Sequence, residues 1–425
     1  MLAEGNIDVG KAEQAFREAA LAEGNAAYIS FLSALPEGTP TCPDCGSVMK
    51  SDGRRGKRVV SMLGEGMFSR TYFECEKCNT HAFPKDAALG IAGTSFSPGV
   101  KRAASKLAAF EPFETSSQLL WELSGVNICS KDIERIAKSA GQAIIDECQS
   151  RIEAAFSDNE DDAGIVMHKA VPVMYIEYDG TGIPARKPET EGRAGKQDDG
   201  TAKTREMKTG CIFTQHGKDE KGRPMRDRGS TSYFGAIEKA EGFVRRVYAE
   251  ALHRGIQAAE RVVIIGDGAK WVWNIAELHF PEATHIVDIY HAKEHIGGLL
   301  KSTVSDGGER KALQGQMYAF LDAGDIPSLT DMMMCLPQDN KEKRELVESE
   351  SAYFLNNAHR MDYATFKKQG LFVGSGVIEA GCKHVIGKRL KQSGMHWSVY
   401  GANSIAALRC QILSGRFGEG AFMAA

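Results

Sequence analysis

Residues 171–182 read VPVMYIEYDGTG, and this stretch decides the class of fold that the sequence predicts. An apolar and aromatic run bounded by glycines is typical of a buried strand. The run ends in an acid, Asp179, and residues 261–267, RVVIIGD, repeat the pattern with Asp267. A buried strand gains nothing from a carboxylate, so an acid where strand meets loop indicates a side chain that projects into a site. The alternative is that both Asp-Gly pairs only form turns.

The pattern around these two strands favours an α/β domain over residues 170–425. Strands are predicted at 208–215, 230–234 and 285–290, helices at 238–256, 270–280 and 375–391, and a helical insertion at about 296–370. The last helix carries Glu379 near its start. An Asp on the first strand, an Asp on the fourth strand and a Glu on a late helix are how an RNase H-like sheet assembles a two-metal site. Mg²⁺ or Mn²⁺ would suit such a set of oxygen ligands.

Four of the ten cysteines form two CxxC pairs with 29 residues between the pairs: Cys42, Cys45, Cys75 and Cys78. The N-terminus lacks the apolar segment of a secretory signal, which disfavours a disulfide framework. The spacing is typical of a tetrahedral zinc site, and the residues between the pairs read as two strands around a Gly-Glu-Gly turn. We therefore expect a zinc ribbon over residues 41–84; a redox dithiol pair or incidental cysteines are the alternatives.

The rest of the N-terminal half reads as helical. A helical arm is predicted over residues 1–40, ending at Leu35-Pro36, and a linker over residues 84–98. A helical region is predicted over residues 85–160, with an acidic linker at 156–168 as its end. A capping box is predicted at 115–118, a helix stop at 124–125, and a new helix capped by Ser130. This pattern is compatible with helix-turn-helix DNA binding and equally with an ordinary helical hairpin.

Basic residues gather in two places within a chain of net charge −4. Residues 41–110 hold eleven Lys/Arg against six Asp/Glu, and residues 373–417 hold six against one. Candidate phosphate contacts are Arg54, Arg55, Lys57 and Arg58 in the first segment, and Lys383, Lys388, Arg389 and Lys391 in the second. A solvated basic face is the alternative for both. No apolar run approaches the roughly 18 residues that span a bilayer, so we expect no membrane partner.

Several long motifs, in this order, resemble the ISKra-type insertion-sequence transposases: YDGTG, GRAGKQDDGTAKTREMKTGCIFTQ, IGDGAKWVWNIAELHFPEATHIVDIYHAKEH and GLFVGSGVIEAGCKHVIGKRL. The resemblance covers roughly residues 40–415. It implies an RNase H-like DDE domain, with Asp179, Asp267 and Glu379 as the metal-binding triad, that cuts and joins DNA at transposon ends. Asp288-Ile-Tyr-His291 resembles an Asp/Cys-x-x-His signature of related transposases. His291 would then contact DNA or orient a carboxylate; a core histidine is the alternative.

The resemblance also implies double-stranded DNA as partner, a homo-oligomer in the synaptic complex, and a cytoplasmic protein associated with the nucleoid. The C-terminal residues GRFGEGAFMAA depart from the family pattern. A transposase that has lost catalysis and only binds DNA through its ribbon is therefore the alternative function. A cellular nuclease on the same fold is a third.

Overall fold

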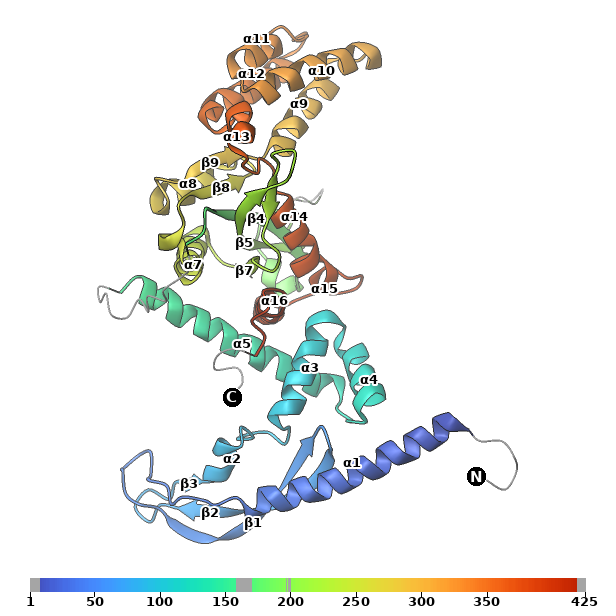
Figure 1. Cartoon of the computed structure of the whole chain (residues 1–425), viewed down its shortest axis with the longest axis vertical. Helices are drawn as coiled ribbons and strands as arrows, with labels where there is room; N and C mark the ends of the chain where they lie inside the picture. Colours follow the sequence, from blue (N-terminus) through green and yellow to red (C-terminus); the bar gives the residue numbers. More distant parts are fainter. Residues whose placement is uncertain (1–7, 158–169, 196, 198–199, 419–425) are drawn as a thin grey trace. The chain divides into compact units, whose positions relative to one another are not determined.

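The computed structural model describes residues 8–157, 170–195, 197 and 200–418 (Figure 1). The chain divides into two compact units, Met1–Glu147 with Gly418–Ala425, and Cys148–Phe417. Each unit is described by itself. Nearly all of the acidic linker predicted at 156–168, and the last seven residues of the C-terminal stretch, lie outside the described residues. In the part of the chain that is described, no helix combines the length and the apolar character needed to cross a membrane.

The first unit begins with a long helix beside a three-stranded antiparallel sheet. Helix α1 (Val9–Ala34) ends before Pro36, as predicted, and the sheet consists of β1 (Lys50–Ser61), β2 (Gly64–Glu74) and β3 (His81–Ala82). The predicted Gly-Glu-Gly turn is wrong, because Ser61 pairs with Gly64 and these glycines belong to β2. A Cβ on Gly66 would lie 2.5 Å from Ile29 of α1, so this glycine allows the helix to pack closely on the strand.

The predicted linker at 84–98 is part of the folded ribbon. Its first residues form α2 (Pro84–Ala88), and Ile91 is buried in a small core against α1 and the sheet. Asp86 pairs with Lys57 at 3.2 Å and with Arg70 at 2.7 Å, and all three side chains are largely buried. A sheet this small needs the segment as a second layer, since two or three strands alone bury too little apolar area.

Three helices complete the first unit: α3 (Pro98–Phe110), α4 (Phe113–Ser124) and α5 (Ser130–Ala155), the last of which continues into the second unit. The predicted capping box does not form, because α4 begins at Phe113 and the Ser116 hydroxyl donates to the Glu111 carbonyl at 3.3 Å. The predicted stop is confirmed: Gly125 ends α4 with φ of 74°.

A six-stranded mixed sheet forms the centre of the second unit. The strand order is β6-β5-β4-β8-β9, with β7 also paired to β5. The neighbours of β4 are the antiparallel β5 and the parallel β8, and β9 is parallel to β8. The strands are β4 (Val173–Pro184), β5 (Thr204–Lys218), β6 (Pro224–Arg226), β7 (Ser232–Ala236), β8 (Val262–Gly266) and β9 (Thr284–Val287). Helix α6 (Lys187–Thr190) lies between β4 and β5 in the chain.

Helices cover both faces of this sheet (Figure 1). Helices α7 (Ala240–His253) and α8 (Lys270–His279) pack on one face, where the Tyr178 hydroxyl donates to the Val272 carbonyl at 2.7 Å. The other face meets α14 (Gly376–Gly381), a π-helical turn (Cys382–Gly387) and α15 (Lys388–Leu390), which replace the single predicted helix at 375–391. A further helix, α16 (Val399–Leu413), follows and contacts β7.

The predicted helical insertion is present as five helices: α9 (Ile289–Thr303), α10 (Gly307–Ala323), α11 (Ile326–Met334), α12 (Lys341–Asn356) and α13 (Tyr363–Gln369). It begins earlier than predicted. The strand expected at 285–290 ends at Val287, because Asp288 caps α9 by accepting a hydrogen bond from the Tyr290 amide at 2.7 Å.

Candidate metal centre and active site

The four CxxC cysteines converge on one point in the ribbon. Their sulfur atoms all lie within 4.8 Å of one another, as a tetrahedral zinc site with bonds of about 2.3 Å and sulfurs about 3.8 Å apart requires. Each pair sits on the same kind of turn: Gly46 N donates to Cys42 O at 2.9 Å, and Asn79 N donates to Cys75 O at 2.8 Å. Gly46 and Asn79 have positive φ, 69° and 54°, which glycine and asparagine tolerate best. The cysteines are therefore positioned to bind a metal such as zinc.

The thiols of this centre influence one another. Hydrogen bonds from Ser47 lower the pKa of Cys45 to about 6. The hydrogen bond and the charge of Cys45 contribute to raising the pKa of Cys78 to about 12. The two exposed thiols thus oppose each other's ionisation, and a divalent cation bound by both would favour the thiolate form of each.

The two predicted aspartates lie side by side at the carboxyl end of the central strands. The parallel pairing of β4 with β8 ends at Glu177 and Ile265, and Asp179 and Asp267 each stand two residues beyond that pair. β4 continues to Pro184 beside β5, so Asp179 lies within the strand and not at its end. Burial, and then the negative charge of Asp267, raise the pKa of Asp179. A partly buried carboxylate beside a second one is a natural site for cations.

The third carboxylate, Glu379, lies on α14, which runs beside β4. Ile378 N donates to the Glu177 carboxylate at 2.8 Å, and the Cys382 thiol lies 3.8 Å from Asp179 Oδ2. Glu379 follows Ile378 directly on α14 and lies one helical turn before Cys382. Its side chain is 47% exposed and 3.9 Å from the Lys383 ammonium.

The three carboxylates do not form a tight cluster in the way the cysteines do. Among the described residues, only the four cysteines form a group of three or more potential ligands with all ligand atoms within 4.8 Å of one another. A two-metal site does not need that spacing: ions about 3.5–4 Å apart with bonds of about 2 Å leave ligands of opposite ions up to about 8 Å apart.

A cleft of about 630 Å³ opens beside Asp267, between the end of β8 and helices α9 and α12 of the insertion. His291 lines it with a half-exposed side chain, so it is not a core histidine. The charge of His291 lowers the pKa of Asp179, after the larger effects of burial, a backbone hydrogen bond and Asp267. His291 therefore faces the two aspartates.

Two residues that line the cleft, His295 and Tyr353, were not predicted from the sequence, nor was Glu350, which contacts His295. The imidazole of His295 is 2.7 Å from the Glu350 carboxylate, a contact that raises the pKa of His295, and it stacks on Tyr353 with ring centres 4.2 Å apart. The Tyr353 hydroxyl donates to the Asp267 carbonyl at 3.2 Å. The spacing of His295 four residues after His291 is a signal that could have identified it. Nothing in the sequence signals Glu350 or Tyr353.

Asp288, predicted as an accessory residue, has no exposed surface. One of its oxygens caps α9, and the other accepts hydrogen bonds from the amide and the hydroxyl of Ser375. It is therefore engaged within the fold and does not open into the cleft.

Two of the eight predicted DNA contacts are wrong. Arg389 has no exposed surface and lies over the ring of Trp397 at 5.1 Å. The reason is the π-helical turn before it, which changes the helical phase on which the prediction depended. Only 14% of the Lys57 side chain is exposed, and its ammonium pairs with Asp86 within the ribbon. The other six are exposed: Arg54, Arg55, Arg58, Lys383, Lys388 and Lys391, of which Arg58 pairs with Glu65.

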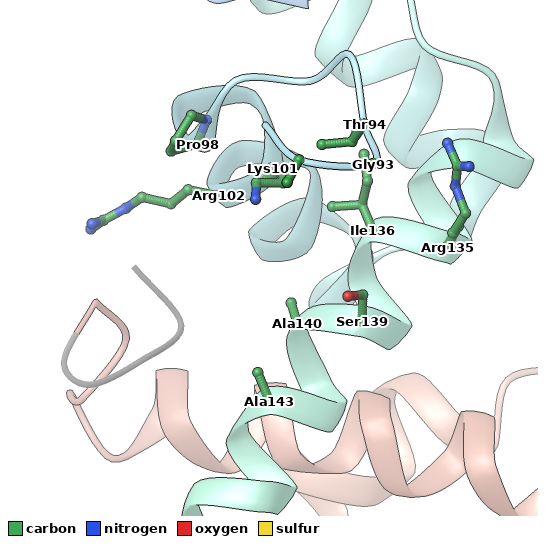
Figure 2. A pocket seen from close by; sticks show the side chains of 11 residues that line it. Gly93, Thr94, Pro98, Lys101, Arg102, Arg135, Ile136, Ser139, Ala140 and Ala143 are labelled. Carbon is green, nitrogen blue, oxygen red and sulfur yellow. The ribbon is translucent and has the colours of Figure 1, made fainter. Parts of the chain in front are cut away.

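A separate pocket of about 280 Å³ lies between α3 and α5 of the first unit (Figure 2). Eleven residues line it, of which three are cationic and none is acidic. Arg102 and Arg135 stand on opposite sides of it in Figure 2, and Ala140 and Ala143 follow the α5 face between them. Burial lowers the pKa of Lys101, whose ammonium donates to the Gly90 carbonyl at 2.9 Å.

Fold and site together define a mixed α/β protein with four cysteines positioned to bind a metal and with two aspartates just beyond the parallel pairing of its central strands. The model of the uncharacterised protein family UPF0236 matches residues 48–421, and the chain belongs to this family.

Two UPF0236 proteins illustrate the similarity. One from Caldanaerobacter subterraneus subsp. tengcongensis is 25% identical over 361 residues, which cover 83% of this chain and 67% of the relative. Its name joins eleven locus designations of that organism. One from Streptococcus gallolyticus, named for the vanSb 3′ region, is 24% identical over 370 residues, 85% of this chain and 73% of the relative.

Proposed function

We propose that the protein is a DNA transposase with an RNase H-like catalytic domain, which cleaves and joins DNA through an Asp-Asp-Glu two-metal site. The observation that carries this proposal is the equal register of Asp179 and Asp267, each two residues beyond the last pair between β4 and β8. Glu379 would join them from α14, whose residue Ile378 donates to Glu177 of the same strand. Carboxylates from three separate elements are the hard oxygen ligands that Mg²⁺ and Mn²⁺ prefer.

The sheet order supports the RNase H-like assignment. The first strand of the sheet, β4, is central, with the antiparallel β5 on one side and the parallel β8 on the other. This order makes the strand of Asp179 the direct neighbour of the strand that leads to Asp267, which a shared metal site requires.

The names of the relatives add a second, independent support. The name of one relative joins eleven locus designations of a single organism. A genetic element that inserts copies of itself into a genome would give such a set of loci. Such repetition is not expected of a single-copy cellular nuclease. An active transposase and one that has come to bind DNA without cutting it would both show this repetition, and only a cleavage assay separates the two.

The chemistry follows from the residues present. Mg²⁺ or Mn²⁺ held by the three carboxylates would lower the pKa of an attacking water and stabilise the leaving oxygen of a phosphodiester. Asp179 and Asp267 would supply the negative charge that the ions neutralise; burial, and then the charge of Asp267, raise the pKa of Asp179. Lys383 and Lys388 follow Glu379 in the chain, and both side chains are exposed. They would hold the DNA phosphates that flank the cleaved bond. His291 would donate to a phosphate oxygen from the cleft side.

Double-stranded DNA is the proposed partner, and three surfaces are suited to it. They are the exposed Arg54 and Arg55 on the ribbon, the cationic pocket between α3 and α5, and the lysines after Glu379. Arg and Lys are the usual contacts to DNA phosphates. Pairing of two transposon ends would call for a homo-oligomer, and the bound protein would lie on the nucleoid. The zinc of the ribbon would be structural, because all four ligand positions are cysteines.

The test is cleavage of labelled DNA that carries the terminal repeats flanking the gene, with Mg²⁺ or Mn²⁺ against EDTA. Metal-dependent nicking at the repeat boundary is expected for the wild type, and loss of at least a hundredfold in rate for Asp179→Asn, Asp267→Asn and Glu379→Gln. Asp331→Asn, an exposed acid on α11, is the matched control and should cut normally. Binding of the repeats without any cutting would instead favour the alternative, a transposase that has lost catalysis.

A further inference from the structure

The strand that carries Asp179 presents a row of polar side chains to the segment that carries Glu379. Tyr175, Glu177 and Asp179 alternate along β4 and therefore share one face of the sheet. Residues 372–382 lie along that face. The three side chains meet this segment in chain order, at the Phe372 amide (3.2 Å), the Ile378 amide (2.8 Å) and the Cys382 thiol (3.8 Å).

Glu177 is the unusual member of this row. It is fully buried, so the carboxyl group costs folding free energy where an apolar side chain would not. One carboxyl oxygen accepts from Ile378 N, and the other has no hydrogen-bond partner among the described residues. Ile378 is the third residue of α14, and the amides of a first helical turn have no partner within the helix. Glu177 therefore caps α14 from a different element.

The residue that would ordinarily cap α14 is engaged elsewhere. Ser375 stands at the N-cap position, yet its side chain makes no hydrogen bond to the helix. Its hydroxyl and its amide both donate to Asp288, which is itself fully buried. Just before it, Gly374 approaches α9 so closely that a Cβ would lie 2.7 Å from the Tyr290 ring. The start of α14 is thus attached to β4 through Glu177 and to α9 through Asp288.

We propose that Glu177 and Asp288 are positioning residues, which hold the start of α14 so that Glu379 is directed at the Asp179–Asp267 pair. The inference rests on the proposed function for the role of Glu379. Helix α14 runs directly into the π-helical turn and α15, and the contacts of Glu177 and Asp288 fix where this segment begins. Groups that orient metal-binding residues typically change metal affinity or activity by about 10–100-fold when removed.

The experiment compares Glu177→Leu, which removes the acceptor, with Glu177→Gln, which keeps an acceptor oxygen at similar volume. Ser375→Ala tests the second attachment with a smaller change, and Cys211→Ala, a buried neighbour of Glu177, is the matched control. Mn²⁺ binding to the zinc-loaded full chain is measured by electron paramagnetic resonance without DNA. Hydrogen exchange of residues 375–382, cleavage rate and DNA affinity are measured on the same samples.

Glu177→Leu is expected to weaken Mn²⁺ binding and to slow cleavage by about 10–100-fold, with faster exchange at Ile378 and unchanged DNA affinity. Glu177→Gln and Cys211→Ala should stay within about threefold of wild type, and Ser375→Ala should fall between. If Glu177→Leu and Ser375→Ala both keep the wild-type Mn²⁺ affinity and the wild-type protection of the Ile378 amide, the inference is overturned. So would a wild-type chain that binds no Mn²⁺. A wild-type chain that binds Mn²⁺ through Glu379 but never cuts DNA would refute the proposed function and leave the positioning role supported.

Discussion

Removing the metal of the ribbon should unfold its two cysteine turns and leave the second unit intact. The apolar cluster around the cysteines contains only two buried side chains besides Cys42 and Cys75, those of Met49 and Phe73. Burying each of these two is worth about 1.5–3 kcal/mol. Ordering the backbone of the two turns, residues 41–49 and 74–82, costs about 1–2 kcal/mol per residue, several times more in total. A structural zinc, worth about 10–16 kcal/mol, would supply most of the difference.

The variant Cys42→Ser tests this reasoning, because Cys42 is buried in the centre and its loss leaves three ligands. We expect zinc content to fall from about one per chain to near zero, and amide protection to disappear over 41–49 and 74–82. The β1–β2 hairpin should stay protected, since Val59 and Phe68 pack against Leu32 of α1. Cys335→Ser, an exposed cysteine outside the centre, is the control. Zinc-free protein with protected turns would refute the argument.

Three further predictions concern the cleft and the helical region. The pKa of His295 is raised by Glu350, so its contribution is present below the unfolded pKa of about 6.5 and lost as pH rises through the folded pKa. His295→Gln should therefore lower the unfolding free energy by about 1.5–3 kcal/mol at pH 6 and less at pH 9; equal losses would contradict this. Gly268→Ala should cost about 1–3 kcal/mol in a denaturant titration, because φ is +90° and a Cβ would lie 2.5 Å from the Tyr353 hydroxyl oxygen; no cost would be contrary evidence. The double variant Arg102→Ala/Arg135→Ala should weaken DNA binding and reduce the slope of log affinity against log salt by up to about 1.8, and an unchanged slope would exclude the pocket from the DNA interface.

The sequence predicted the α/β class, the four cysteines and the two aspartates because each depends on local chemistry. An apolar strand that ends in an acid, and a CxxC pair on a tight turn, are readable from a few neighbouring residues. The helical insertion was also predicted, but its start was not. Asp288 looks like the continuation of an apolar strand, and only its capping of α9 and its bonds to Ser375 show that the strand has ended.

Predictions that depended on packing between distant segments were less accurate. Lys57 was predicted to meet DNA, since a row of basic residues on a hairpin reads as an exposed face. Lys57 is largely covered because residues 84–91, which were expected to be a linker, pack against the sheet and place Asp86 beside its ammonium. Arg389 was misplaced for a similar reason, because a π-helical turn cannot be read from a 3.6-residue period.

The third carboxylate is the hardest part of the site to derive from sequence, because its place depends on residues far away in the chain. Asp179 and Asp267 are brought together by strand register alone. Glu379 comes after five helices of insertion, and what directs it to β4 is a bond from its neighbour Ile378 to Glu177, 201 residues earlier. Glu177 itself reads as an ordinary interruption of an apolar strand. A buried carboxyl group without a charged partner is costly, so a chain that keeps one should use it. That cost is the physical reason to look for its role at the start of α14.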